Sequence, residues 1–268
     1  MYLSSVPLHI PIGLNSSIDY TLQQMIYSKN FFDAMATAVV TEQCSSTEVE
    51  NWTEDDLVPK MAVFWLSDII PQCLLENAHS RRLFDYDVTK ETASTAPFLS
   101  TSCSLSTFCV GRFFERLRNE YPEEYVDLHL HTLKAPIVQM GGDILTVVTS
   151  LAIDLHMNSN RTDDKPLARI ELESTALLKP EIVNNTLSGS MSGIHNEFKL
   201  AFSQIGIPSK ALLALLENAV SETLTSMVET IVQAGVPLPI HSSVALSDQS
   251  EIRVFDRCIR VNADFIPN

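Results

Sequence analysis

The stretch Ser209–Pro239, SKALLALLENAVSETLTSMVETIVQAGVPLP, predicts one long amphipathic helix with a defined end. Its apolar residues recur at helical spacing over about five turns, and polar residues occupy the opposite side. Ser209 can cap the start of the helix, whereas Gly235 suits the left-handed position that ends one, with Pro237 close behind. The apolar stripe consists of Leu212, Leu215, Leu216, Ala219, Val220, Leu224, Met227, Val228 and Ile231. Such a stripe has to be buried against another part of the chain.

The chain before this helix changes to a period of two, which predicts β-strands. The alternation is clearest in Ala168–Leu178, and it is also present in Tyr125–Leu133, Ile144–Met157 and Ile194–Phe202. Within the first of these segments, one face carries Ala168, Ile170, Leu172, Ala176 and Leu178, and the other carries Arg169, Glu171, Glu173 and Thr175. Long strands with one apolar and one polar face are typical of an antiparallel sheet with one face in water.

Shorter elements are expected on either side of these strands. Met61–Ala78 is mostly apolar and predicts a helix kinked or begun anew near Pro71, and Thr107–Glu120 predicts a second helix. The first helix would place Leu66, Ile69, Ile70, Cys73 and Leu74 on one face. Two strands close the chain, Ser242–Ser247 and Glu251–Phe265, and the second has a bulge near Asp256. After that bulge, one side would carry Ile259, Val261, Ala263 and Phe265.

These elements predict an α+β fold. A long, strongly twisted antiparallel sheet would wrap around the one long amphipathic helix, because a sheet of long strands has to curl to bury such a helix. The acidic segment 42–60 has little periodicity and indicates a linker between residues 1–41 and a larger unit at 61–268.

Charge and composition exclude several classes of function. The chain of 268 residues carries 18 Lys and Arg against 33 Asp and Glu, a formal net charge of −15, which repels nucleic acid and anionic membrane surfaces. Glycine-rich phosphate loops are not expected with 8 glycines, and a G-x-S-x-G motif is absent. His129, His131 and His156 are a weak metal signal, so we expect no metal, no cofactor and no catalytic residues.

Two further features concern covalent modification. Four N-x-[ST] sequons begin at Asn15, Asn51, Asn160 and Asn184, and we expect them to be glycosylated. The five cysteines lack zinc spacing, and the separation of Cys103 and Cys109 permits a disulfide. The odd count leaves at least one thiol free or paired outside the chain.

The segment Gly235–Pro239, followed by SSVALSDQSEIRVFDRCIRVNADF, resembles the end of the C-terminal domain in the family of bactericidal/permeability-increasing protein, lipopolysaccharide-binding protein and the phospholipid and cholesteryl ester transfer proteins. Leu66-Ser67-Asp68 is similar to the start of the same C-terminal barrel. Ser17 to Val40 is similar to the stretch before the interdomain linker, so residues 1–41 would be a remnant of a preceding domain with strands of a central sheet.

The resemblance implies a tubular barrel whose apolar pocket takes the acyl chains of phospholipid or another lipid, without catalysis. Such a protein would bind or transfer lipid, be secreted and take part in innate defence. We expect the chain to be a fragment or truncated product with a missing N-terminal barrel, not to span a membrane and not to bind nucleic acid. An interaction or scaffold domain of the same fold with a collapsed pocket is the alternative. The pocket would be lined by Leu66, Ile69, Ile70, Leu74, Leu212, Leu216, Val220, Leu224 and Val228.

Overall fold

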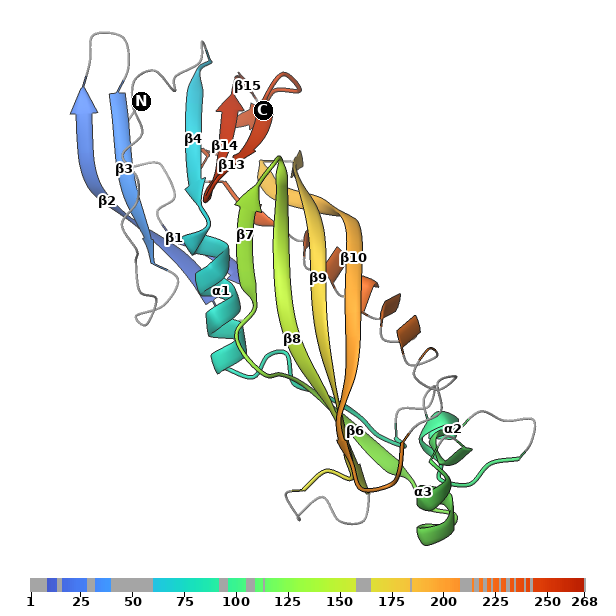
Figure 1. Ribbon diagram of the computed structural model, residues 1–268. Coiled ribbons are helices and arrows are strands. Elements are labelled where there is room, and N and C mark those ends of the chain that lie inside the picture. Colours follow the sequence, from blue (N-terminus) through green and yellow to red (C-terminus); the bar gives the residue numbers. More distant parts are fainter. Residues whose placement is uncertain are drawn as a thin grey trace.

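Antiparallel strands dominate the computed structural model of the chain (Figure 1). It describes residues 9–13, 16–27, 32–39, 60–91, 96–104, 109–112, 114–157, 165–183, 185–207, 235–238, 240–241 and 243–267, with twelve positions between 214 and 233. These ranges contain a large sheet, three small ones and a few short helices.

The large sheet has the strand order β11-β10-β9-β8-β6-β5, with β7 paired to the first half of β8. This order is an open path, so the described strands form a twisted sheet that does not close into a barrel (Figure 1). The strand bounds are Tyr86–Val88 for β5, Val126–Thr132 for β6, Ile137–Gly141 for β7, Ile144–Met157 for β8, Ala168–Val183 for β9, Thr186–Ser203 for β10 and Val236–Pro237 for β11.

The alternation in the sequence correctly predicts the faces of β9. Its buried residues at this end are Ala168, Ile170, Leu172, Ser174, Ala176 and Leu178, which include all five apolar positions of the predicted inner face. The predicted strands are too short, however, because β9 and β10 both extend past them, as far as the pair Val183 and Thr186. Asn185 adopts a left-handed backbone (φ 62°) there, and its side-chain amide donates to the Val244 carbonyl at 3.0 Å.

The prediction of a helix from Met61 is wrong for its first part. Ala62–Ser67 is strand β4, and only Ile69–Ser80 forms the helix α1. Leu66 therefore lies in a strand, opposite Ile259. An apolar run that is covered on both faces has no periodicity, so sequence alone cannot distinguish a buried strand from a helix.

The end of the chain forms a hairpin that pairs with β4. Strands β13 (Glu251–Phe255) and β14 (Cys258–Ala263) are joined by a turn at Asp256-Arg257, where the sequence suggested a bulge in one long strand. The expected apolar side is confirmed, since Ile259, Val261 and Ala263 are buried in one cluster with Val138 and Met140 of β7. The short strands β12 (Val244–Leu246) and β15 (Phe265–Pro267) pair beside it.

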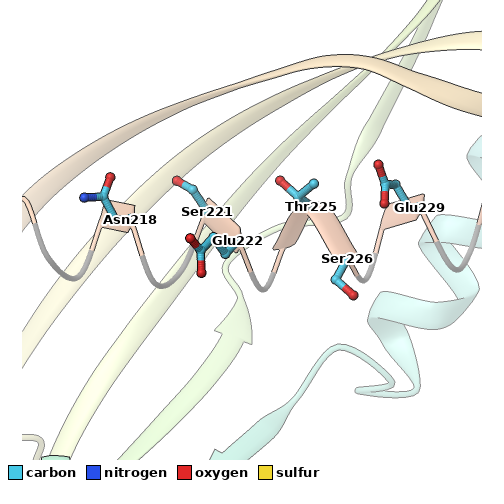
Figure 2. Close-up of a pocket in the computed structure, with 6 residues that line it drawn as sticks. All are labelled: Asn218, Ser221, Glu222, Thr225, Ser226 and Glu229. Carbon is cyan, nitrogen blue, oxygen red and sulfur yellow. The ribbon is translucent and has the colours of Figure 1, made fainter.

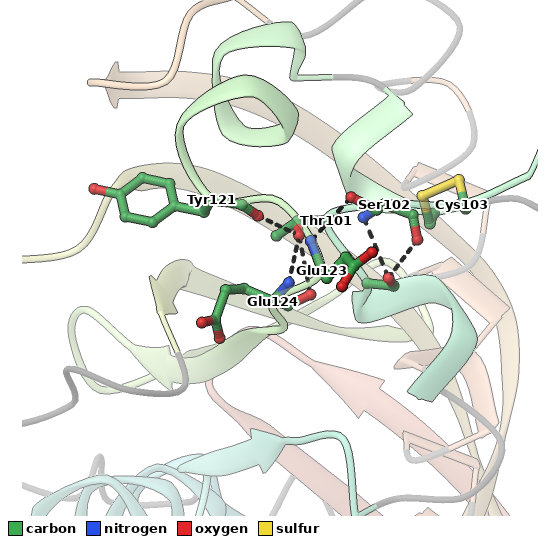
Figure 3. Close-up of a disulfide and its surroundings, with 8 residues drawn as sticks. Thr101, Ser102, Cys103, Tyr121, Glu123 and Glu124 are labelled. Carbon is green, nitrogen blue, oxygen red and sulfur yellow. Dashed lines mark hydrogen bonds between the residues drawn. A yellow bond between two sulfur atoms is a disulfide. The ribbon is translucent and has the colours of Figure 1, made fainter.

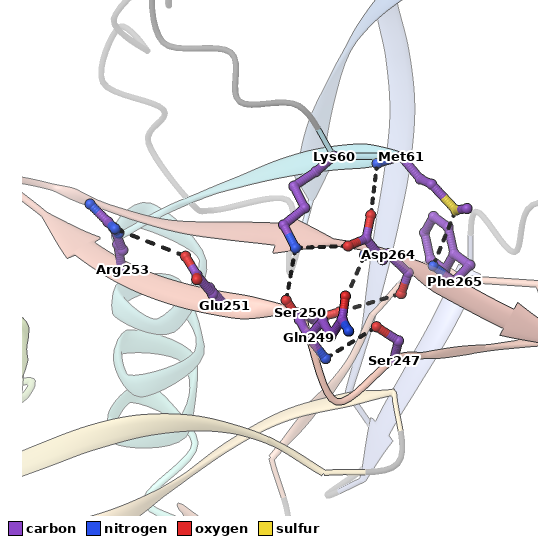
Figure 4. Close-up of polar contacts among 9 residues, drawn as sticks. All are labelled: Lys60, Met61, Ser247, Gln249, Ser250, Glu251, Arg253, Asp264 and Phe265. Atoms are coloured by element: carbon purple, nitrogen blue, oxygen red, sulfur yellow. Dashed lines mark hydrogen bonds and ion pairs between the residues drawn. The ribbon is translucent and has the colours of Figure 1, made fainter.

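Polar contacts join the residues just before β4 to the residue that follows β14 (Figure 4). Lys60 Nζ lies 2.7 Å from Asp264 Oδ2 and donates to the Gln249 carbonyl at 2.9 Å. The Met61 amide donates to Asp264 Oδ1 at 3.2 Å. The bond from Lys60, with the one from Met61, lowers the pKa of Asp264 below its ordinary value.

The opposite end of the sheet is closed by short helices and a disulfide (Figure 3). The predicted helix Thr107–Glu120 is instead the 3₁₀ turn η3 (Val110–Arg112) and α3 (Glu115–Glu120), with α2 (Ala96–Leu99) nearby. Cys103 and Cys109 form the disulfide that their spacing permits. Thr101 Oγ1 accepts from the Glu124 amide at 2.9 Å, and the buried core here includes Leu99, Val110, Phe114, Leu117, Val126 and Ile205.

Near the N-terminus, β1 (His9–Gly13), β2 (Ser16–Tyr27) and β3 (Phe32–Val39) form a separate antiparallel sheet. The predicted linker falls almost entirely on 42–59, outside the described residues. In the region of the predicted long helix, the described positions between 214 and 233 are helical and lie beside β10 (Figure 1).

Gly235 is left-handed (φ 62°), as its predicted place at the helix end requires. We expect Gly235→Ala to destabilise the fold more than Gly142→Ala. Both glycines have nearly the same φ, and a left-handed backbone costs a residue with a Cβ about 1–2 kcal/mol. A Cβ at Gly235 would also lie 2.6 Å from the Leu187 carbonyl oxygen, whereas one at Gly142 meets nothing within 4 Å. Urea denaturation measures both changes, and equal losses would contradict the steric part of this argument.

Candidate functional site

The face of the large sheet that meets the long helix is lined with apolar side chains. Leu151 of β8 lies opposite Leu172 of β9, which lies opposite Phe198 of β10. Leu151 and Leu172 are buried, and Phe198 is half-buried. A second apolar row, Ile153, Ile170 and Leu200, is next to it on one side, and a third, Val147, Ala176 and Ile194, lies two rows away on the other. We call this surface the inner face.

Contacts along β10 define how the helix crosses the inner face. Leu224 is 8% exposed and packs in one cluster with Leu151 and Leu172. Asn196 Nδ2 donates to Ser221 Oγ at 2.7 Å, and a Cβ on Gly189 would lie 3.0 Å from Val232 Cγ1. As the helix advances from 221 to 232, its contacts move from 196 back to 189, so it runs antiparallel to β10.

The structure places some of the predicted lining residues and not others. Leu224 is buried on the inner face and Val228 is half-buried, whereas Leu212, Leu216 and Val220 lie outside the described residues. Leu66 packs against the other cluster, around β14. On α1, Ile69, Ile70 and Leu74 are half-buried.

Helix α1 lies at the other side of the sheet from the long helix, beside β7 (Figure 1). Gln72 fixes it there, since its Oε1 accepts from the Val138 amide at 2.9 Å and its Nε2 donates to the Pro136 carbonyl at 3.1 Å. His79 Nδ1 lies 2.6 Å from Thr132 Oγ1. The cluster that contains Leu224 includes no residue of α1. Within the described residues, the two groups of predicted lining residues are therefore not in one cluster.

A hollow of about 420 Å³ follows the flank of the long helix. Figure 2 shows the side chains of Asn218, Ser221, Thr225 and Glu229 projecting to the same side of the helix. The described residues that line it are all polar: Asn218, Ser221, Glu222, Thr225, Ser226 and Glu229. We call this hollow the polar groove. It adjoins β10, because Ser221 also binds Asn196.

The polar residues of the inner face were not predicted from the sequence. Thr149, Ser174 and Asn196 are opposite one another on β8, β9 and β10, between two apolar rows. Ser174 is 6% exposed. Each is a polar residue at a position where the alternation calls for an apolar one, and that irregularity was the available signal. Only the register between the strands shows that the three form a row.

The opposite face of the sheet, the outer face, carries a group of charges around Asp154. Arg169 donates two hydrogen bonds to the Asp154 carboxylate, at 2.6 and 2.7 Å, and His131 Nε2 lies 3.1 Å from it. Burial raises the pKa of Asp154, but the bonds from Arg169 and His131 outweigh it, so the pKa lies below the ordinary value. The same contact raises the pKa of Arg169.

The histidines that gave the weak metal signal make other contacts in the structure. His129 Nδ1 lies 2.7 Å from Asp87 Oδ1, and its ring stacks on that of His131 with centroids 5.1 Å apart. Among the described residues, no group of His, Cys, Asp and Glu is arranged to hold a metal ion. The sequon asparagines Asn15, Asn51, Asn160 and Asn184 all lie outside the described residues.

Comparison with known proteins supports the fold and extends over most of the chain. The family model described as "LBP / BPI / CETP family, C-terminal domain" matches residues 13–266. The crystal structure of lipopolysaccharide binding protein superimposes with a TM-score of 0.63 at 16% identity, covering 100% of this chain and 57% of that one. At that identity the likeness shows the fold alone.

A curated human protein is also similar over part of the chain. Dynein axonemal heavy chain 17 from Homo sapiens is 26% identical over 164 residues, which is 58% of this chain and 4% of that protein. The chain therefore spans a small part of this relative. Within the described residues, no helix has the length and apolarity needed to cross a membrane.

We expect Asp154→Asn to weaken the fold at neutral pH by about 1–3 kcal/mol, because it removes the charge that Arg169 and His131 bind. The lowered pKa means that the folded protein binds fewer protons than the unfolded chain, whose Asp keeps the ordinary value near 3.8. Wild-type stability should therefore be full above that value and decline as pH falls through the folded pKa.

The measurement is chemical denaturation at a series of pH values from 7 downwards. The variant should lose less stability than the wild type on acidification below pH about 4. Glu173→Gln, a change at an exposed position on the neighbouring strand β9, is the control and should keep the wild-type profile. Parallel profiles for wild type and Asp154→Asn would show that Asp154 does not carry the acid sensitivity.

Proposed function

The chain belongs to the LBP/BPI/CETP family, and from this premise we propose that it binds lipid, without catalysis, in an apolar slot between the inner face and the long helix. The slot takes acyl chains and the helix forms one of its walls. Of the nine residues predicted from the sequence to line it, the five on the long helix remain our candidates for this slot, with Leu224 as the best placed.

The packing of Leu224 against Leu151 and Leu172 is the observation that carries this proposal. This contact indicates that the apolar side of the helix faces the sheet. Ile194 and Phe198 are only half-buried beside that contact. Partly covered apolar side chains next to a helix are a surface that hydrocarbon can cover in place of water.

Burial of hydrocarbon supplies enough free energy for such a function. Each methylene moved out of water contributes about 0.8 kcal/mol, so a sixteen-carbon chain contributes on the order of 10 kcal/mol before entropy costs. No reacting group is needed to extract a lipid on this basis. Affinity would then depend on the volume and apolar area of the slot.

We also propose that residues 61–268 form the lipid-binding domain, that the protein is secreted and glycosylated at its sequons, and that it acts in lipid transfer or innate defence. The disulfide Cys103–Cys109 supports an oxidising compartment. Since the chain spans 57% of the lipopolysaccharide binding protein chain, a preceding barrel is part of the proposal. The net charge of −15 argues against endotoxin as the ligand, because both would be anionic.

A bulky side chain on the inner face should block the slot. We expect Ile194→Trp to weaken uptake of a fluorescent fatty acid by roughly tenfold or more, because the indole would occupy space beside Leu224. Leu177→Trp is the matched control, since Leu177 is on the neighbouring strand but is 37% exposed on the outer face. Fluorescence titration gives the affinities.

Thermal unfolding of both variants tests whether they fold. If the wild type and Ile194→Trp take up the fatty acid with equal affinity, the lipid binds elsewhere. A folded wild type that takes up no fatty acid, and yields no lipid to organic extraction and mass spectrometry, would instead support an interaction domain with a collapsed pocket.

A further inference from the structure

We propose that the lipid bound by this protein is uncharged and carries a hydroxyl group, which donates a hydrogen bond to Asn196 at the mouth of the slot. This inference rests on the proposed function and adds the chemical class of the ligand. Monoacylglycerols, diacylglycerols, sterols and ceramides share that chemistry: a large hydrocarbon part with a neutral hydroxyl at one end.

The first observation is the row of polar side chains across the inner face. Thr149, Ser174 and Asn196 are neighbours on adjacent strands, and Ser221 of the helix continues the row through its bond to Asn196. Apolar rows lie on both sides, so this is one polar level in an apolar surface. A ligand lying along the inner face would be matched there by a polar group and by hydrocarbon elsewhere.

The second observation is the hydrogen-bonding state of Asn196. Its Nδ2 donates to Ser221, but its Oδ1 is buried and accepts no bond from any described residue. Buried side-chain oxygens in native proteins nearly always have a donor. The missing donor fits a ligand group with an O–H, because an ester or ether oxygen can only accept.

The third observation is the charge of the polar groove. Its described lining contains two carboxylates, Glu222 and Glu229, and no cationic side chain. Phosphate or carboxylate headgroups would be repelled there. A cationic headgroup would be drawn to the exposed carboxylates, but at the buried Oδ1 of Asn196 it would lose its hydration without a counter-ion. An uncharged hydroxyl avoids both costs.

These observations place the two parts of the ligand. The hydrocarbon covers the apolar rows around Leu172 and Leu224, and the hydroxyl end meets Asn196 and Ser221, where the slot adjoins the polar groove. The groove offers further hydroxyl and amide groups, such as Thr225 and Asn218, to a headgroup with more than one hydroxyl.

The test compares ligands that differ only at the polar end. Hexadecanol, palmitate, methyl palmitate and hexadecylamine share a sixteen-carbon chain, and each is titrated against the full chain loaded with a fluorescent, uncharged lipid probe. We expect hexadecanol to displace the probe at roughly tenfold lower concentration than methyl palmitate or palmitate, because a site built around a hydroxyl rejects analogues without one.

Asn196→Leu should remove this preference while keeping affinity for methyl palmitate, since it replaces the acceptor with an apolar group of similar size. Ser192→Ala is the matched control on the same strand; Ser192 is exposed and donates to the Leu177 carbonyl at 3.0 Å. Asn196→Ala gives a second variant that removes the acceptor without adding atoms, so a misfolded Asn196→Leu does not end the test.

The outcomes separate this inference from the proposed function. Equal displacement by all four ligands, or a wild-type preference that a folded Asn196→Leu or Asn196→Ala retains, overturns the role of Asn196 while lipid binding stands. Preference for palmitate or hexadecylamine overturns the uncharged class. Failure of the wild type to bind the probe or any of the ligands overturns the proposed function itself.

Discussion

The packing of one helix against the inner face of a long sheet is the constraint on which the rest of this structure depends. Strands as long as β8, β9 and β10 expose a continuous apolar face, and that face is unstable in water unless something covers it. Separate clusters cover its two ends, one around Phe114 and Leu117 and one around Ile259 and Val261. Between them the described cover is the helix, through Leu224. A ligand that replaces part of this cover has to bind in that middle section.

Sequence pattern was enough for the parts of the fold in which a single face is buried. The alternation in β9 identified its buried residues, and Gly235 marked the left-handed helix end. The pattern failed at β4, whose six residues are all half-buried, because its apolar run shows no alternation. It also failed at Asp256-Arg257, where a non-glycine residue adopts φ 62° and no glycine marks the turn.

The candidate site divides in the same way. Leu224 was predictable as part of its apolar lining, because hydrophobic burial depends on the period of each element taken alone. Its polar residues were not, since Thr149, Ser174 and Asn196 lie far apart in the sequence and become neighbours only through strand register. Function in this fold would depend on such register, and a single sequence contains little direct information about it.

The two faces of the sheet differ in whether their buried polar groups have hydrogen-bond partners. On the outer face Asp154 is buried, but Arg169 and His131 satisfy it within the protein, so no ligand is required there. On the inner face Asn196 keeps an acceptor for which the described residues offer no donor. Apolar rows give affinity in proportion to the area they bury and discriminate poorly between acyl chains of equal length. The single polar row would therefore supply most of the discrimination between lipids, because an unmatched group there loses a hydrogen bond that water cannot replace.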